Sequence, residues 1–336
     1  MQINRVALDL AKQVIQVHAV DRSGHALVRK SMRRSALLPF FEELAPCDVG
    51  MEACSSAHHW GRQLQAMGHR VRLLPPQYVK PFVLGQKNDA NDAAAICAAM
   101  ARQEIPTVQV KTIAQQDQQA LHRIRSARVA QRTALVNQTR GLLAEYGLVV
   151  ATGRTTLRCA LPTLLEDASN GLSFDFRQLL AELYDELVAL DARVEQLTRR
   201  IEQQVKQHPD AQRLLQIPGI GPLTASALIT SVGNATQFRN GRQLAAFLGL
   251  VPRQHYSGGK ARLLGIHKRG DSYLRGLLVH GARSVLRTAT NKPDDRSRWL
   301  MNLSVRRHRN IATVAQANKT VRIVWAVLAR NESYRP

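Results

Sequence analysis

The sequence predicts a mixed α/β domain followed by an all-α remainder, within a chain of 336 residues. Apolar runs with strand-like alternation and helical runs alternate over residues 1–102. Long helical patterns follow, and one of them carries apolar residues at heptad spacing. A glycine-containing helical hairpin then precedes a basic segment. We expect three domains, at residues 1–110, 111–206 and 207–336.

The N-terminal domain should begin with a β-meander and continue with strands and helices in alternation. The Asp21-Arg22-Ser23-Gly24 cluster predicts a turn between the second and third strands, and Pro75-Pro76 ends the last strand. The predicted strands are residues 3–9, 13–20, 26–31, 47–52 and 69–74, and the predicted helices are 35–44, 56–67 and 89–102. This order of elements is similar to that of ribonuclease-H-like nucleases.

Four carboxylates in this domain form the strongest chemical signal. Asp9 interrupts the apolar run 6–10, Glu52 ends a strand, and Asp89 and Asp92 lie three apart at the start of a helix. Two carboxylates about 4 Å apart repel by roughly 4 kcal/mol at an effective dielectric of 20, so a shared site requires cations. Magnesium prefers such oxygen ligands, and two ions can hold both oxygens of a phosphoryl transfer. The alternative is four scattered surface acids.

Composition favours a polyanionic partner. The formal net charge is +22, and residues 251–336 carry +14 of it. A solvated basic tail is the alternative, although this segment is also apolar and patterned. The four cysteines form no CxxC pair, which argues against a cysteine zinc site and against a disulfide framework. No signal peptide or apolar run of membrane-spanning length is evident, so we expect a cytoplasmic protein with no membrane partner.

Long helices should fill the middle of the chain. The pattern over residues 113–146 predicts one helix. Its arginines, which include Arg125, Arg128 and Arg132, either contact phosphates or form a solvated face. Residues 149–173 are expected to be irregular. A heptad series then comprises Leu180, Leu183, Leu187, Leu190, Val194, Leu197 and Ile201. It indicates a coiled coil, either between chains or within a hairpin, unless it is ordinary helix packing.

Two motifs in the C-terminal domain suit phosphate binding. Residues 214–228 match a helix-hairpin-helix in which Gly219 and Gly221 permit a tight turn and backbone contact with phosphate; a plain helical hairpin is the alternative. In residues 253–276, Ser257 precedes two glycines amid cations, which indicates a phosphate-binding loop with an exposed hydroxyl. Those cations are Arg253, Lys260, Arg262, Lys268 and Arg269. A simple turn is the alternative.

Together these motifs resemble a family of bacterial insertion-sequence transposases, the RNA-guided bridge recombinases of the insertion-sequence family numbered one hundred and ten. The family combines an N-terminal RuvC-like domain of the DEDD type with a C-terminal serine-bearing domain. The resemblance covers nearly the whole chain. It rests on residues 8–12, 51–54, 87–93, 217–221, 246–253 and 257–260, taken in that order and spacing.

The resemblance implies a mechanism and partners. Asp9, Glu52, Asp89 and Asp92 would bind Mg²⁺, as two ions per site with Mn²⁺ as a substitute, and Ser257 would attack DNA to form a transient phosphoserine link. A structured noncoding guide RNA would select donor and target DNA by base pairing. A homo-oligomer, a dimer or a tetramer on DNA in the nucleoid, would assemble the site from two subunits. The runner-up is a metal-dependent nuclease or junction resolvase that uses water as its nucleophile.

Overall fold

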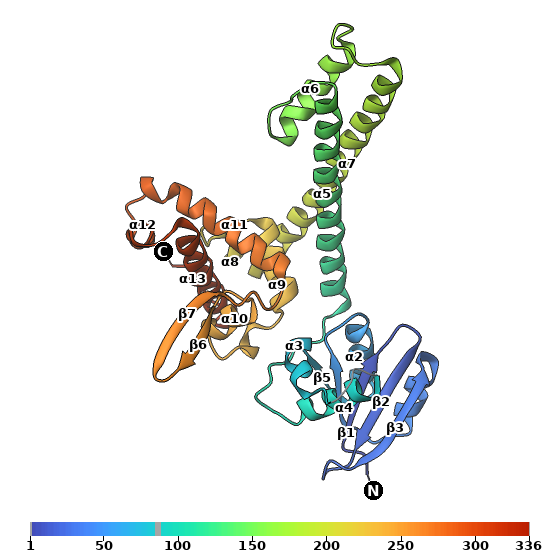
Figure 1. Cartoon of the computed structure of the whole chain (residues 1–336). Helices are drawn as coiled ribbons and strands as arrows, with labels where there is room; N and C mark the ends of the chain where they lie inside the picture. Colours follow the sequence, from blue (N-terminus) through green and yellow to red (C-terminus); the bar gives the residue numbers. More distant parts are fainter. Residues whose placement is uncertain (1, 85–88, 336) are drawn as a thin grey trace. The chain divides into compact units, whose positions relative to one another are not determined.

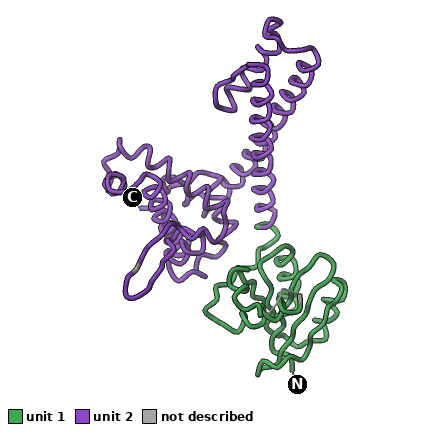
Figure 2. Tube along the Cα trace, viewed as in Figure 1, with its two compact units in different colours: residues 1–115 green, residues 116–336 purple. Residues whose placement is uncertain are grey.

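The computed structural model describes residues 2–84 and 89–335, with the side chains of Asp89 and Ala261 excepted. The chain divides into two compact units, residues 1–115 and 116–336 (Figure 2). Lys87 and Asn88, which belong to the predicted motif 87–93, lie outside the described residues. The predicted boundary at 206/207 falls at the last residue of a long helix, Phe174–Gln207, of the second unit and remains a prediction.

Unit 1 is a five-stranded sheet flanked by helices (Figure 1). The strand order is β3-β2-β1-β4-β5. The pairs β1–β2 and β2–β3 are antiparallel, whereas the pairs β1–β4 and β4–β5 are parallel. The strands are β1 (Arg5–Leu10), β2 (Val14–Val20), β3 (Ala26–Arg33), β4 (Asp48–Glu52) and β5 (Arg70–Leu74). The helices are α1 (Leu37–Glu42), α2 (Ala57–Ala66), α3 (Pro76–Val79) and α4 (Asp89–Met100). The predicted α/β domain is confirmed.

The alternation along β1 separates two layers of core. Val6 and Leu8 pack with residues of α1 and α2 on one face, whereas Ala7 packs with residues of α4 on the other. Gly50 on β4 lets α4 lie close to the sheet, because a Cβ at this position would be 2.1 Å from the Met100 sulfur. Side chains two residues after Ala7 and two residues after Gly50 therefore also face α4.

Unit 2 begins with long helices. They are α5 (Ile113–Glu145), which starts at the end of unit 1, α6 (Arg154–Glu166) and α7 (Phe174–Gln207), and α5 and α7 lie side by side (Figure 1). The expectation that residues 149–173 are irregular is wrong for most of the segment. Gly153 and Pro162 suggest breaks, yet Leu157 and Leu161, one helical turn apart, are fully buried against α5 and α7. That burial outweighs the cost of a proline inside a helix.

The heptad residues are buried within one chain. Leu180, Leu187, Leu197 and Ile201 are at most 1% exposed, and Leu183 and Leu190 are half-buried in the same core as α5 and α6. The seam is therefore covered by this chain's own helices, as expected for ordinary packing in a helical hairpin.

The rest of unit 2 is a helical bundle with one β-hairpin. Its helices are α8 (Pro209–Leu215), α9 (Pro222–Val232), α10 (Gly241–Phe247), α11 (Ser272–Thr288), α12 (Asp295–Arg306) and α13 (Arg309–Ala329). The hairpin strands are β6 (Pro252–Ser257) and β7 (Lys260–Ile266), which pair only with each other among the described residues. Short 3-10 turns occur at Arg34–Ala36, Lys80–Phe82, Ala235–Gln237 and Ala289–Asn291. Across the described ranges, no helix combines the length and apolarity that a membrane span requires.

Candidate functional site

The acids of unit 1 lie on elements that meet on one face of the sheet. Asp9 follows Ala7 by two residues on β1, and Glu52 follows Gly50 by two on β4, so both belong to the face covered by α4. The parallel register pairs Leu8 with Met51, which makes Asp9 and Glu52 the next positions of neighbouring strands. Asp92 lies on α4, one turn before the buried Ile96.

The charges of Asp9 and Glu52 both act on the Cys54 thiol. The pKa of the Cys54 thiol is raised, first by loss of solvent around the sulfur and then by the negative charges of Glu52 and Asp9. Both carboxylates are therefore close enough to this sulfur to act on it. Asp89 is the first residue of α4, but its side chain lies outside the described residues.

The donor chemistry suits a hard divalent cation. Asp9, Glu52 and Asp92 are half-buried carboxylates on facing elements, and carboxylate oxygens are the ligands that Mg²⁺ prefers. Among the side chains that the structure describes, no three acids, histidines or cysteines are close enough together to hold a metal ion. The acid set fits such an ion by residue type and by sheet face.

Ser257 lies at the end of a hairpin strand, and every residue of β6 is exposed. Gly258 and Gly259 form the two-residue turn with φ of 56° and 76°, and left-handed values at both positions are the pattern that glycine supplies most readily. The expected loop is therefore a β-hairpin. The Gly-Gly pair is a sequence signal that could have predicted the hairpin.

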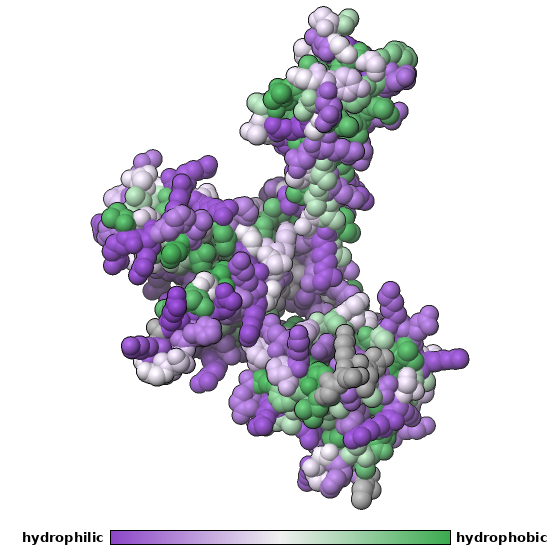
Figure 3. Space-filling view, in the orientation of Figure 1, coloured by the Kyte–Doolittle hydropathy of each residue, from purple (hydrophilic) through white to green (hydrophobic). Residues whose placement is uncertain are grey.

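The hairpin register gathers polar groups on one face with the serine. Lys260 is directly opposite Ser257, and His255 is opposite Arg262 two residues further along. Opposite residues share a face, and positions two apart return to it, so these four side chains lie together. Tyr256 and Leu263, at 68% and 66% exposure, belong to the other face. Figure 3 shows hydrophilic side chains gathered over the helices and hairpin of this unit.

Close backbone packing holds the base of the hairpin on the bundle. A Cβ at Gly249 would be 2.1 Å from the Arg269 carbonyl oxygen, and one at Gly270 would be 2.1 Å from that of Phe247. Both glycines also have positive φ. The His267 amide donates to the Val251 carbonyl at 3.0 Å. The predicted cations Arg253, Lys268 and Arg269 are exposed around this base, so a fixed base carries an open tip.

The predicted helix-hairpin-helix corresponds to α8, α9 and the turn between them. Gly219 has a φ of 90°, and a Cβ there would be 3.0 Å from the Gly281 carbonyl oxygen on α11. The glycine is thus required by packing against α11. Gly221 caps the start of α9, with nothing within 4 Å of its Cβ direction. Phosphate binding by this turn remains a prediction.

The three predicted phosphate contacts on α5 differ in what they touch. Arg132 donates to the buried Asp191 at 2.9 Å, and Arg125 donates to Thr198 at 2.7 Å, so both are occupied inside the helical hairpin. Arg128 is exposed, and its one hydrogen-bond partner among the described residues is Gln131, one turn along its own helix. Internal pairing accounts for Arg125 and Arg132 without a nucleic acid.

Comparison with known proteins identifies the class. A family model described as "Transposase" of the DEDD type matches residues 6–148, and one described as "Transposase IS116/IS110/IS902 family" matches residues 211–299. The first match contains all four acids, and the second contains Ser257 and the helical hairpin. The chain is therefore similar, in both of its units, to transposases of insertion sequences.

Relatives match over the full length. A "probable family 20 transposase" of Pseudomonas aeruginosa is 52% identical over 100% of both chains. The transposase for insertion sequence element IS1111A of Coxiella burnetii is 45% identical over 99% of this chain and 92% of its own length. The transposase for element IS1328 of Yersinia enterocolitica is 37% identical over 97% and 96%. The chain belongs to the IS110/IS116/IS902 family of transposases, whose DEDD domains are typically metal-dependent.

Proposed function

We propose that this transposase is an RNA-guided DNA recombinase in which Ser257 is the nucleophile. The observation that carries the proposal is the hairpin: a serine hydroxyl is exposed at its tip, with Lys260 opposite and His255 and Arg262 on the same face. Cations beside a hydroxyl hold a phosphodiester and stabilise the charge that develops during attack.

The proposed reaction conserves phosphodiester bonds. The Ser257 oxygen forms a bond to phosphorus and loses its proton, the bond from phosphorus to the leaving DNA oxygen breaks, and that leaving oxygen takes up a proton and ends as a hydroxyl. The hydroxyl end of another strand then attacks the phosphoserine and restores the serine. Each step exchanges one phosphate ester for another, so no external energy source is required.

The four acids would hold the divalent cations of this reaction. Mg²⁺ bound by Asp9, Glu52, Asp89 and Asp92 would supply Lewis-acid stabilisation of the reacting phosphate. The supporting observation is that Asp9 and Glu52 follow the paired positions Leu8 and Met51 of neighbouring parallel strands, on the face that α4 covers, and that Asp92 lies on α4. Mn²⁺ should replace Mg²⁺, since it accepts the same oxygen ligands.

Base pairing by a structured guide RNA would select donor and target DNA. The net charge of +22 supports a nucleic-acid partner and would supply sequence-independent affinity for its phosphate backbone. We also propose that the protein works as a homo-oligomer on DNA in the cytoplasm. Changing the pairing segment of the RNA should redirect recombination to a matching DNA target, whereas an unchanged target would contradict guidance.

The decisive experiment traps the covalent intermediate. Protein, guide RNA, Mg²⁺ and nicked DNA are mixed, and a protein–DNA adduct is sought on a denaturing gel. Ser257→Ala should abolish the adduct, while Ser169→Ala, a change at another exposed serine of unit 2, should retain it. An adduct with Ser257→Ala excludes this nucleophile. Metal-dependent cleavage without any adduct supports instead a nuclease that uses water.

Variants of the acids separate metal binding from the serine step. Asp9→Asn and Asp92→Asn should remove both the adduct and the rise in melting temperature that Mn²⁺ produces in the unmodified protein. Ser257→Ala should keep that rise. A rise that persists in both acid variants would contradict their assignment as ligands.

A further inference from the structure

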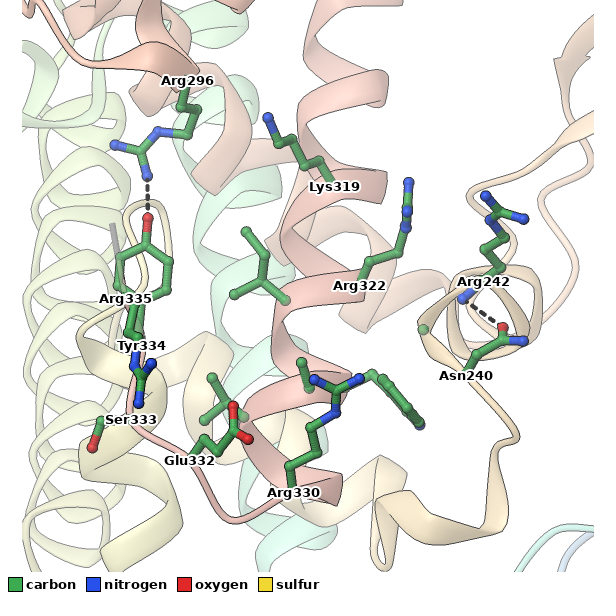
Figure 4. A pocket seen from close by; sticks show the side chains of 15 residues that line it. Asn240, Arg242, Arg296, Lys319, Arg322, Arg330, Glu332, Ser333, Tyr334 and Arg335 are labelled. Atoms are coloured by element: carbon green, nitrogen blue, oxygen red, sulfur yellow. Dashed lines mark hydrogen bonds between the residues drawn. The ribbon is translucent and has the colours of Figure 1, made fainter.

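We infer that a basic pocket in the C-terminal bundle binds the phosphate backbone of a nucleic-acid strand at a site separate from the Ser257 hairpin. The pocket has a volume of about 640 Å³ and is formed by α10, α13, the start of α12 and the C-terminal segment 330–335 (Figure 4). Its cationic side chains are Arg242, Arg296, Lys319, Arg322, Arg330 and Arg335. Glu332 is the one carboxylate among the lining residues that the structure describes.

The cations of α13 form a stripe on one helical face. Lys319, Arg322 and Arg330 follow at spacings of three and eight residues, which keeps them on the same side, while Val321 and Val324 of the opposite side are buried in the core. Figure 4 shows Lys319 and Arg322 projecting from this helix to either side, and the Lys319 ammonium lies over the Trp299 ring at 4.5 Å. The stripe is thus set by the amphipathic pattern of α13.

A close contact between two backbones brings Arg242 beside this stripe. A Cβ at Gly241 would be 2.7 Å from the Arg322 Cα and 2.9 Å from its carbonyl oxygen. The start of α10 therefore lies directly on α13, and Arg242 is the next residue along. Arg242 and Arg322 are both exposed, and within the described chain neither guanidinium has an acidic partner.

Other groups of the pocket are held in place. The Trp325 indole donates to the Phe238 carbonyl at 2.9 Å, and Arg330 lies over its ring at 5.7 Å. Arg296 donates to the Tyr334 hydroxyl at 3.2 Å, and its Nε is buried without a hydrogen-bond acceptor in the described part of the chain. Protein partners therefore leave donor capacity in this pocket unused.

The composition of the pocket favours phosphodiesters over carboxylates as ligands. Five of its six cations are arginines, whose planar forks match phosphate oxygens with paired hydrogen bonds. The lining cations outnumber Glu332 and Asp294, the acid that lies 3.7 Å from Arg296, so an entering anion would be stabilised. A strand of DNA or RNA supplies repeated phosphates, and both carry the same chemistry. The inference rests on the nucleic-acid partner of the proposed function but not on its serine chemistry.

The test measures binding in the absence of reaction. Ser257→Ala protein in EDTA is titrated against labelled duplex DNA and against labelled single-stranded RNA of equal length, at several salt concentrations. The same measurement follows on Arg242→Ala/Arg322→Ala. Two lost phosphate contacts should reduce the slope of log affinity against log salt by about 1.8 for a duplex or about 1.4 for a single strand.

A matched control removes the same charge elsewhere. Arg199 and Arg298 are exposed and each pairs with an acid of its own helix, Glu195 and Asp295, so Arg199→Ala/Arg298→Ala should change the slope little. A loss confined to DNA or to RNA identifies the strand that the pocket holds. If neither slope falls below that of the control, the inference is wrong.

A charge-retaining variant distinguishes binding from folding. Arg242→Lys/Arg322→Lys keeps both positive charges and should retain most of the salt dependence, although it loses the bidentate geometry. If the lysine variant loses as much as the alanine variant, the effect is structural and the pocket is not a phosphate site. Because no strand is cut in EDTA, failure of the Ser257 mechanism cannot produce either result.

Discussion

A buried carboxylate surrounded by three arginines should hold the long helices of unit 2 together. Asp191 on α7 is 6% exposed and accepts from Arg132 of α5 at 2.9 Å and from Arg158 of α6 at 3.1 Å, with Arg154 of α6 as a third donor. Burial alone would raise the pKa of Asp191, but the hydrogen bonds and charges of Arg154 and Arg132 outweigh it and lower that pKa. Asp191→Asn would remove the charge while keeping the shape.

The magnitude follows from how exposed the arginines are. Removing one partner of a fully buried ion pair costs about 3–5 kcal/mol. Arg132 is only 19% exposed and would remain poorly solvated, whereas Arg154 and Arg158 are each 42% exposed and would be rehydrated at little cost, as surface pairs contribute about 0–1 kcal/mol. We therefore expect Asp191→Asn to reduce the free energy of unfolding by about 2–3 kcal/mol.

Urea unfolding of the full chain, followed by helical circular dichroism, measures this change. Glu195→Gln is the control, since Glu195 lies one turn along the same helix and forms an exposed pair with Arg199. It should cost under about 0.5 kcal/mol. The pKa of Asp191 is lowered in the folded chain, so its contribution is present at neutral pH and is lost as the pH falls below the ordinary carboxyl range. If Asp191→Asn and Glu195→Gln have equal free energies of unfolding at pH 7, the reasoning is refuted.

Two further changes test the packing of the C-terminal bundle. Burial, followed by the charge of Arg125, lowers the pKa of His122 to about 4, so the unfolded chain binds more protons than the folded chain below pH 6.5. We expect this group alone to reduce the free energy of unfolding by about 2 kcal/mol between pH 7.5 and pH 5. In urea titrations, the free energy of unfolding of His122→Gln should therefore fall less over this pH range. Gly281→Ala should lower the melting temperature, because its Cβ would be 1.9 Å from the Gly219 carbonyl oxygen. Gly276→Ala on the same helix meets nothing within 4 Å and should be neutral or stabilising by up to about 1 kcal/mol; equal effects would contradict the contact.

The sheet and the long helices were predictable because their patterns are local. Alternation along β1 and β2 and the heptads of α7 each require one buried face, which determines the type of element. The helix α6 was missed since Gly153 and Pro162 disfavour a helix locally, whereas its stability comes from Leu157 and Leu161 packing on distant residues. Local propensity cannot register such contacts.

The candidate site was predictable to a different degree in each unit. Strand-end position and helical spacing assigned Asp9, Glu52 and Asp92 to their elements, and the register adds that the first two are neighbours on one face. Arg132 was misleading, because a cation in a basic chain suggests phosphate, yet its partner Asp191 is 59 residues away in sequence. The pocket near Arg322 was missed for the same reason, since its walls come from α10, α12 and α13.

The exposure of Ser257 has a consequence for how its reaction would be controlled. A serine hydroxyl is a weak nucleophile until a base or a cation assists loss of its proton. Within the described chain, no side chain hydrogen-bonds to Ser257, and the hairpin tip is open to water. Its activation would therefore have to come from groups supplied when nucleic acid and cations assemble on the protein. Without that assembly the serine would attack DNA slowly, and the fixed base of the hairpin would hold the tip in position for it.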